Sequence, residues 1–263
     1  IKLSMVWSSN TLILPGSGIL GDRLVKFPSA HYEGVPENEY AMMTWAAASG
    51  LNVPQCELQP GTELGTIPES FQRAATSSVF VIRRFDREGD KRIHMEDFSQ
   101  ILGGWPKDKY GGAGHERLGL LILNLCGESD FLEYIRRVVF CLGIGNEDAH
   151  LKNWSVLYED PVVPRLSPVY DLVSTIQFDD LTRGLALKLH KTREAKKIDR
   201  SSFQRLAHKV GFDADRVLSV VDETLDAMAE SWHHLEGELP VDDLFRQKLK
   251  NYQRTVPLLK PLA

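Results

Sequence analysis

The sequence predicts an α+β protein with a small β-rich first lobe, residues 1–85, and a larger, mainly helical second lobe, residues 86–263. Up to residue 85, apolar residues occur in short runs rich in β-branched and aromatic side chains, separated by glycines and prolines, which is the pattern of strands. After residue 86, longer stretches repeat their apolar residues at helical spacing and end at glycines. A cleft between two such lobes is a common place for a ligand.

The first lobe is expected to hold five strands and one helix. The run Val79–Ile82 is continuously apolar, as in a strand that is buried on both faces. The helix, residues 37–49, ends at Gly50, a residue type that readily takes the left-handed conformation found after helices. The strands are expected at residues 1–7, 12–14, 19–27, 51–58 and 79–85.

The second lobe is expected to be helical apart from one hairpin. The hairpin joins residues 156–158 to 165–169 around the segment Pro161–Pro164. The helices are expected at residues 95–102, 116–126, 130–142, 199–211, 213–235 and 241–254.

The bulk composition is that of a globular protein. Of 263 residues 43% are hydrophobic and 25% charged, and the formal net charge is −5. A protein that neutralises nucleic-acid phosphates usually has a basic excess, so direct nucleic-acid binding is not favoured. One local basic run exists, which we interpret as a solvated turn between strands rather than a binding patch. It consists of Arg83, Arg84, Arg87, Lys91 and Arg92.

The three cysteines, Cys56, Cys126 and Cys141, have neither CxxC nor His/Cys zinc spacing. Reduced thiols are the simplest account of them, and they suit a cytoplasmic protein. No run reaches the ~18 consecutive apolar residues that a membrane span requires, and no signal peptide is visible. We therefore expect a protein that does not associate with membranes.

The loop Gly145–Asn153, which follows an apolar helix, holds several residue types that can take part in catalysis. Asp148 and Asn153 stand five residues apart in this loop, and Asp171 follows 18 residues after Asn153. Phosphoryl transfer needs one carboxylate for the proton of the nucleophile, oxygen ligands for Mg²⁺ and positive charge near the phosphates. Asp148 fits the first need, Asn153 with Asp171 the second, and Lys152 could neutralise the transferred phosphate. A polar loop of this kind is often only a loop, and the combination with Asp171 favours the catalytic interpretation.

Lys26 ends an apolar strand in the first lobe, where it could contact the phosphates of a nucleotide or be an ordinary surface lysine. Glu39, on the following helix, could pair with Lys26, although Glu33 and Glu37 compete for that role. His150 could contact a nucleotide or Asp148, or could support the loop structurally, which we favour slightly.

At these residues the chain resembles the HipA family of bacterial toxin kinases. The loop Asn146–Asn153 looks like the family pattern N-x-D-x-H-x-K-N, and Leu166–Ser174 is similar to its L-x-P-x-Y-D-L-L-S segment. Shorter similarities occur in order at Lys26-Phe27-Pro28, Asn38-Glu39, Gly50–Pro54 and Arg84-Phe85-Asp86-Arg87. The resemblance covers about residues 1–190. Only Ile1–Ser4 resembles the family's Gly- and Ser-rich phosphate loop, so the rest of that loop and the family's N-terminal segment are not found in this numbering.

The resemblance implies a bilobal protein-kinase-like fold and an ATP-dependent, Mg²⁺-requiring serine/threonine protein kinase. It implies roles for nine residues. Asp148 would be the catalytic base, with Lys152 beside it. Asn153 and Asp171 would hold Mg²⁺, and Lys26 and His150 would lie at the ATP. The backbone of Arg83, Arg84 and Phe85 would face the adenine. A departure occurs at Arg83, where the family has an acidic residue.

The resemblance also implies partners and a setting. The protein would be the toxin of a toxin–antitoxin system in the bacterial cytoplasm, neutralised by a DNA-binding antitoxin. Its substrate would be a protein, such as an aminoacyl-tRNA synthetase. Two alternatives use the same residues: a phosphotransferase that acts on a small molecule, and a non-catalytic scaffold that binds an antitoxin.

Overall fold

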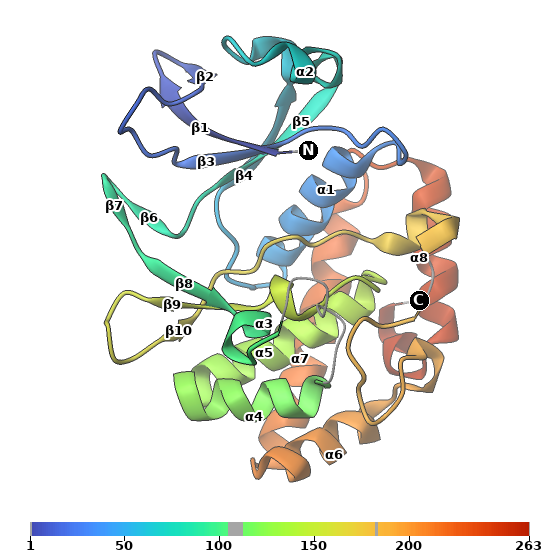
Figure 1. Cartoon of the computed structure of the whole chain (residues 1–263). Helices are drawn as coiled ribbons and strands as arrows, with labels where there is room; N and C mark the ends of the chain where they lie inside the picture. The colour runs from blue at the N-terminus through green and yellow to red at the C-terminus, as the bar shows by residue number, and fades with distance from the viewer. Residues whose placement is uncertain (1, 105–112, 182–183, 263) are drawn as a thin grey trace.

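The computed structural model describes residues 2–104, 113–181 and 184–262. An antiparallel five-stranded sheet, in the order β2-β1-β3-β5-β4, is built from the first 83 residues, and a group of helices lies on one side of it (Figure 1). The α+β class predicted from the sequence is thereby confirmed. The strands are β1 (Lys2–Ser8), β2 (Thr11–Ile13), β3 (Arg23–Lys26), β4 (Cys56–Pro60) and β5 (Ser78–Arg83).

Three of the strands expected in the first lobe are shorter than predicted, and one of them, β5, ends at Arg83 rather than at residue 85. β3 begins only at Arg23, and before it Gly21 approaches β1 so closely that a side chain there would come within 2.3 Å of Ser4 Oγ and 3.0 Å of the Met5 backbone. The chain therefore approaches β1 in a close crossing before it pairs regularly. β4 begins at Cys56 rather than at residue 51. The predicted start of the first strand at Ile1 lies outside the described residues.

Helix α1 (Val35–Ala48) lies between the sheet and the helical part, as Figure 1 shows. Its Trp45 is fully buried and donates a hydrogen bond from Nε1 to the Met228 carbonyl at 3.1 Å. The same indole ring packs against Phe140 and Trp232, with centroids 5.4 and 4.4 Å apart. Although α1 comes from the first part of the sequence, it shares its core with the helices that come later.

A second sheet of three strands, in the order β10-β9-β8, lies at the edge of the helical part. The predicted hairpin is confirmed by β9 (Ser155–Tyr158) and β10 (Arg165–Leu166). The helix predicted over residues 95–102 was wrong at its start: residues 94–97 form β8 (His94–Asp97), and only Phe98–Ile101 forms α3. Asp97 decides the boundary, because it caps α3 reciprocally with Gln100 through two 2.9 Å hydrogen bonds.

Three residues of the basic run, Arg87, Lys91 and Arg92, lie in a small separate hairpin between β5 and β8, whereas Arg83 ends β5. The strands of this hairpin are β6 (Arg87–Glu88) and β7 (Lys91–Arg92), so the predicted turn between strands is confirmed.

The predicted long helices of the second lobe are confirmed, with each end within two residues of its prediction. They are α4 (His115–Cys126), α5 (Glu128–Gly143), α6 (Arg200–Val210), α7 (Ala214–Leu235) and α8 (Asp243–Thr255), with a short α2 (Glu69–Gln72) before β5. Asp199, Asp213 and Asp242 cap the last three long helices through backbone N–H groups. Within the described ranges, no helix is both long and apolar enough to cross a bilayer.

Candidate active site

A cleft of about 530 Å³ opens where the five-stranded sheet faces the loops that follow α5 and β10. Lys26 and Ile82 contribute from β3 and β5, and Phe85 from the segment after β5. The structure brings nearly all the predicted site residues to this cleft, and Asp148 is the exception. The predicted residues that line it are Lys26, Arg83, Arg84, Phe85, His150, Lys152, Asn153 and Asp171.

Lys26 is held between two carboxylates. Its ammonium lies 2.6 Å from Glu39 Oε1 on α1 and 2.6 Å from Asp171 Oδ1. The Lys26 side chain is 19% exposed and that of Glu39 only 2%, whereas that of Asp171 is 45% exposed. The pairing of Lys26 with Glu39 rather than with its competitors is therefore confirmed, and it fixes the lysine at the inner end of the cleft.

One ammonium shared by two carboxylates sets the charges of this group. Burial lowers the pKa of Lys26, but the charges of Glu39 and Asp171 outweigh it, so the pKa lies above its usual range. Burial raises the pKa of Glu39 to about 7, against the opposing effect of Lys26. Burial acts to raise the pKa of Asp171, but the charge and the hydrogen bond of Lys26 lower it, and the net result is a pKa below the usual range. Lys26 and Asp171 thus remain charged at neutral pH, while Glu39 titrates near it.

Asp171 adopts a left-handed backbone conformation with φ of 61°. Aspartate tolerates this region better than most residues with a Cβ atom. One Asp171 oxygen accepts from Lys26, and the other accepts a 2.8 Å hydrogen bond from Asn153 Nδ2. The Asn153 oxygen in turn accepts from the His150 N–H at 3.0 Å. The loop residue and the carboxylate after the hairpin are thereby joined directly.

This pair of donors fits Mg²⁺. A carboxylate and an amide oxygen are hard oxygen ligands, and Mg²⁺ typically takes one or two such protein groups and completes its shell with phosphates and water. Among the described residues, no group of three or more His, Cys, Asp or Glu side chains could hold a metal by itself. The donor set therefore suits a metal that arrives with a nucleotide rather than a protein-enclosed ion.

The loop after α5 owes its path to Gly145, which has φ of 64°. The Gly145 N–H donates to the Leu142 carbonyl and that of Asn146 to Cys141, which ends the helix. A side chain at Gly145 would meet Ile176 at 2.7 Å. Only glycine satisfies both the dihedral and the close approach.

Three polar side chains fasten the two site loops to each other and to α1. Ser174 Oγ donates to the Ile144 carbonyl, and Thr175 Oγ1 donates to Gly145 while accepting from the Glu147 N–H. Asn38, 1% exposed, binds the Ser174 backbone through both its amide oxygen and its amide nitrogen. Asp171 and the loop Gly145–Asn153 are therefore positioned as one unit.

Asp148 does not line the Lys26 cleft. It lines a neighbouring pocket of about 390 Å³ together with Glu147, Thr175, Leu181, Gly184, Ala186 and Arg193. The Asp148 backbone N–H donates a 3.0 Å hydrogen bond to Asn146 Oδ1, within the same loop. The predicted catalytic base and the other predicted site residues thus line two different pockets.

The cleft also contains residues that sequence reasoning did not nominate. Leu24 and Met95 supply apolar lining, and Lys2 adds a cation. Tyr170 lines the cleft, packs against Phe85 with ring centroids 5.5 Å apart and donates to the Lys152 carbonyl at 2.8 Å. Tyr170 could have been found from the sequence, because it comes immediately before Asp171. Met95 could not, because the sequence predicts a helix at that position.

The chain is similar to several known proteins. A model of the family described as HipA-like C-terminal domain matches residues 15–232. "Putative kinase Y4dM" of Sinorhizobium fredii is 34% identical over 252 residues, covering 96% of this chain and 61% of that protein. "Putative kinase Y4mE" of the same organism is 33% identical over 243 residues, covering 87% of this chain and 54% of that protein.

Two solved structures share the fold. A chain of the Shewanella oneidensis MR-1 complex of HipA, HipB and operator DNA matches with a TM-score of 0.78 at 20% identity, covering 99% of this chain and 62% of that one. The Helicobacter pylori proinflammatory kinase CtkA matches with a TM-score of 0.57 at 14% identity, covering 98% and 92%.

The fold is therefore kinase-like, as the sequence predicted. The chain belongs to the HipA-like C-terminal domain family, whose model matches most of its length, and the similar proteins from Sinorhizobium fredii are named as kinases. It spans about three fifths or less of the length of those two relatives.

Proposed function

We propose that this protein is an ATP-dependent serine/threonine protein kinase that acts as the toxin of a toxin–antitoxin system. The observation that carries the proposal is the buried ammonium of Lys26, held 2.6 Å from both Glu39 and Asp171 at the end of a cleft. A cation fixed in this way can receive nucleotide phosphates without further ordering. In this proposal residues 1–85 form the nucleotide side and residues 86–263 the catalytic and metal side.

The cleft offers a place for each part of the nucleotide. The adenine would lie against Leu24, Ile82 and Met95, beside the backbone of Arg83–Phe85. Lys26 would bind the phosphates, and Lys152 and His150 would line the same space. Asn153 and Asp171 would hold Mg²⁺, which supplies charge neutralisation on the phosphates when bound.

Asp148 would orient the substrate hydroxyl and take its proton. Its separate pocket supports this role, because a protein substrate must approach from a side that the nucleotide does not fill. Leu181 and Ala186 give that pocket an apolar wall beside the carboxylate. The placement favours a hydroxyl carried on a larger chain, and a serine or threonine side chain is the simplest such group.

The Shewanella oneidensis HipA was solved with HipB and operator DNA, so we expect a DNA-binding antitoxin protein as a partner of this chain. The resemblance to the HipA family further implies a protein substrate, such as an aminoacyl-tRNA synthetase, in the bacterial cytoplasm.

The test separates chemistry from nucleotide binding. Asp148→Asn should reduce the transfer of labelled γ-phosphate to protein in an extract of the host bacterium by at least about 100-fold. ATP affinity, measured by calorimetry, should be retained, because Asp148 does not line the Lys26 cleft. Asp226→Asn, on the exposed face of α7, is the matched control and should behave as the wild type.

Three results would contradict the proposal. Undiminished transfer by Asp148→Asn would remove that residue from catalysis, and label found only on small molecules would replace the protein kinase by another phosphotransferase. Absence of ATP turnover by the wild type together with tight antitoxin binding would favour the scaffold. Phosphopeptide analysis of cells that express the wild type or Asp148→Asn identifies the substrate and the phosphorylated residue type.

A further inference from the structure

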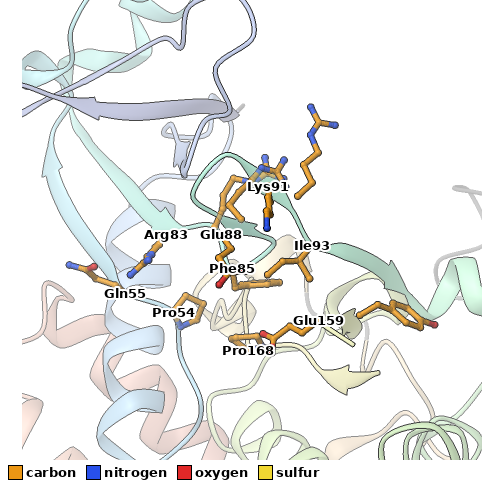
Figure 2. Close-up of a pocket in the computed structure, with 13 residues that line it drawn as sticks. Pro54, Gln55, Arg83, Phe85, Glu88, Lys91, Ile93, Glu159 and Pro168 are labelled. Atoms are coloured by element: carbon orange, nitrogen blue, oxygen red, sulfur yellow. The ribbon is translucent and has the colours of Figure 1, made fainter. Parts of the chain in front are cut away.

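The basic hairpin after β5 forms one wall of another pocket, of about 800 Å³, which shares Arg83, Arg84 and Phe85 with the Lys26 cleft (Figure 2). Five cationic side chains line it. Arg84 and Arg87 are neutralised by Asp86, with contacts of 2.7 and 2.6 Å. Among the residues that the structure describes, Arg83, Lys91 and Arg92 make no ion pair, and all three are exposed.

The opposite side of this pocket is mainly apolar, although Glu159 also lies there, near Pro168. Figure 2 shows Pro54, Phe85, Ile93 and Pro168 gathered in the lower part of the pocket, with Lys91 above them. Phe85 is fixed there by its contact with Tyr170. A ligand that fills the pocket would therefore meet cations on one side and apolar side chains on the other.

From this arrangement we infer that the pocket, hereafter the hinge pocket, docks an acidic and apolar segment of a partner protein. An extended chain directs alternate side chains to opposite faces, so one with alternating acidic and apolar residues would match both walls. The small sheet of β6 and β7 is joined to no other strand of the described chain, which leaves room for an extended segment beside it.

The charges argue against nucleic acid as the occupant. Glu88 and Glu159 also line the hinge pocket, and they would oppose the continuous negative charge of a phosphate backbone more than a few spaced carboxylates that can avoid them. The whole chain carries a net charge of −5, and a protein that binds nucleic acid by its backbone usually has a broad basic excess. A peptide can place its few carboxylates at Arg83, Lys91 and Arg92 and its apolar side chains on the floor.

This inference is independent of the proposed phosphotransfer, because binding is measured without ATP. The probe is a fluorescein-labelled peptide of alternating glutamate and leucine, followed by fluorescence anisotropy at physiological ionic strength. A second peptide replaces every leucine by serine, and a third probe is a single-stranded oligonucleotide of equal charge. We expect saturable binding of the first probe and clearly weaker binding of the other two.

Charge reversal locates the binding. Lys91→Glu/Arg92→Glu should weaken the affinity for the first peptide at least about tenfold, because attraction becomes repulsion at the rim. Lys209→Glu/Lys250→Glu changes the net charge equally at exposed positions of α6 and α8, and should bind as the wild type. Lys91→Gln/Arg92→Gln should give an intermediate loss and guards against misfolding of the reversed hairpin.

Several outcomes would overturn the inference. These are no saturable binding of the peptide to the wild type, equal losses in the two charge-reversal variants, and tighter binding of the oligonucleotide than of the peptide. Equal affinity for the leucine and serine peptides would remove the apolar floor from recognition and would also refute the occupant proposed here.

Discussion

Replacing Lys26 by methionine would remove the one cation shared by Glu39 and Asp171. The substitution preserves most of the volume of the side chain, so the expected effect is mainly electrostatic. Asp171, with its side chain 45% exposed, can turn to solvent, but Glu39 at 2% exposure cannot. The variant therefore leaves a buried carboxylate without its counter-ion.

The magnitude follows from the ways in which Glu39 can respond. Breaking a buried ion pair by removing one partner typically costs about 3–5 kcal/mol. Glu39 can limit the cost by taking up a proton, and because its pKa in the wild type is already about 7, this requires only about 1.4 kcal/mol for each pH unit above 7. Relative to the wild type, this limit is about 1.4 kcal/mol at pH 8, and proton uptake costs nothing further at pH 6. We expect a loss in the free energy of unfolding of about 1 kcal/mol at pH 8 and less at pH 6.

The assay is urea unfolding followed by tryptophan fluorescence, with wild type, Lys26→Met, Glu39→Gln and the double variant. Lys26→Met/Glu39→Gln removes both buried charges, so it should recover at least about 2 kcal/mol relative to Lys26→Met at pH 8. Lys250→Met, at an exposed position, controls for the loss of a lysine. ATP binding should be lost in both Lys26 variants, including the one whose stability returns.

The reasoning would be refuted by a double variant no more stable than Lys26→Met. The same holds for a stability loss that does not change between pH 8 and pH 6, since the proton uptake by Glu39 would then play no part.

Three further predictions concern metal binding, backbone and pH. Asp171→Asn should weaken the Mg²⁺-dependent part of nucleotide binding at least about tenfold, and unchanged calorimetry with and without Mg²⁺ would exclude the metal role. Gly145→Ala should lower the unfolding free energy by about 3 kcal/mol, from its φ of 64° and the 2.7 Å approach of Ile176. Gly211→Ala, with φ of 78° but open space, should cost clearly less, and equal losses would contradict the steric argument. Burial lowers the pKa of His115 to about 4 from an ordinary 6.5, so its contribution to stability is complete above pH 6.5 and is lost as the pH falls toward 4. By pH 5 this loss in the free energy of unfolding is about 2 kcal/mol. The loss should be absent when the unfolding of His115→Gln is measured against pH. It should remain in the control variant His208→Gln, whose substitution is at an exposed site.

The sequence alone was sufficient for the long helices and for eight of the residues that line the Lys26 cleft. Helix ends are signalled by neighbouring residues, such as Asp199 and Asp213 as caps, so they can be recognised locally. Asn153 and Asp171 could be assigned together because the chemistry of phosphoryl transfer restricts which residue types occur at such spacing. Lys26 and Asp171 are 145 residues apart, and the sequence did not indicate that they are in direct contact.

Only the tertiary structure decided how these residues are arranged. Met95 looked helical in isolation, but pairing of β8 with β9 and the cap at Asp97 made it part of a strand. Asp148 lies five residues before Asn153, yet the two face different openings, because the turn of the loop and its anchors Ser174 and Thr175 set the directions of the side chains. A local sequence specifies helix ends and residue types, whereas the facing of side chains depends on contacts between segments that are distant in the chain.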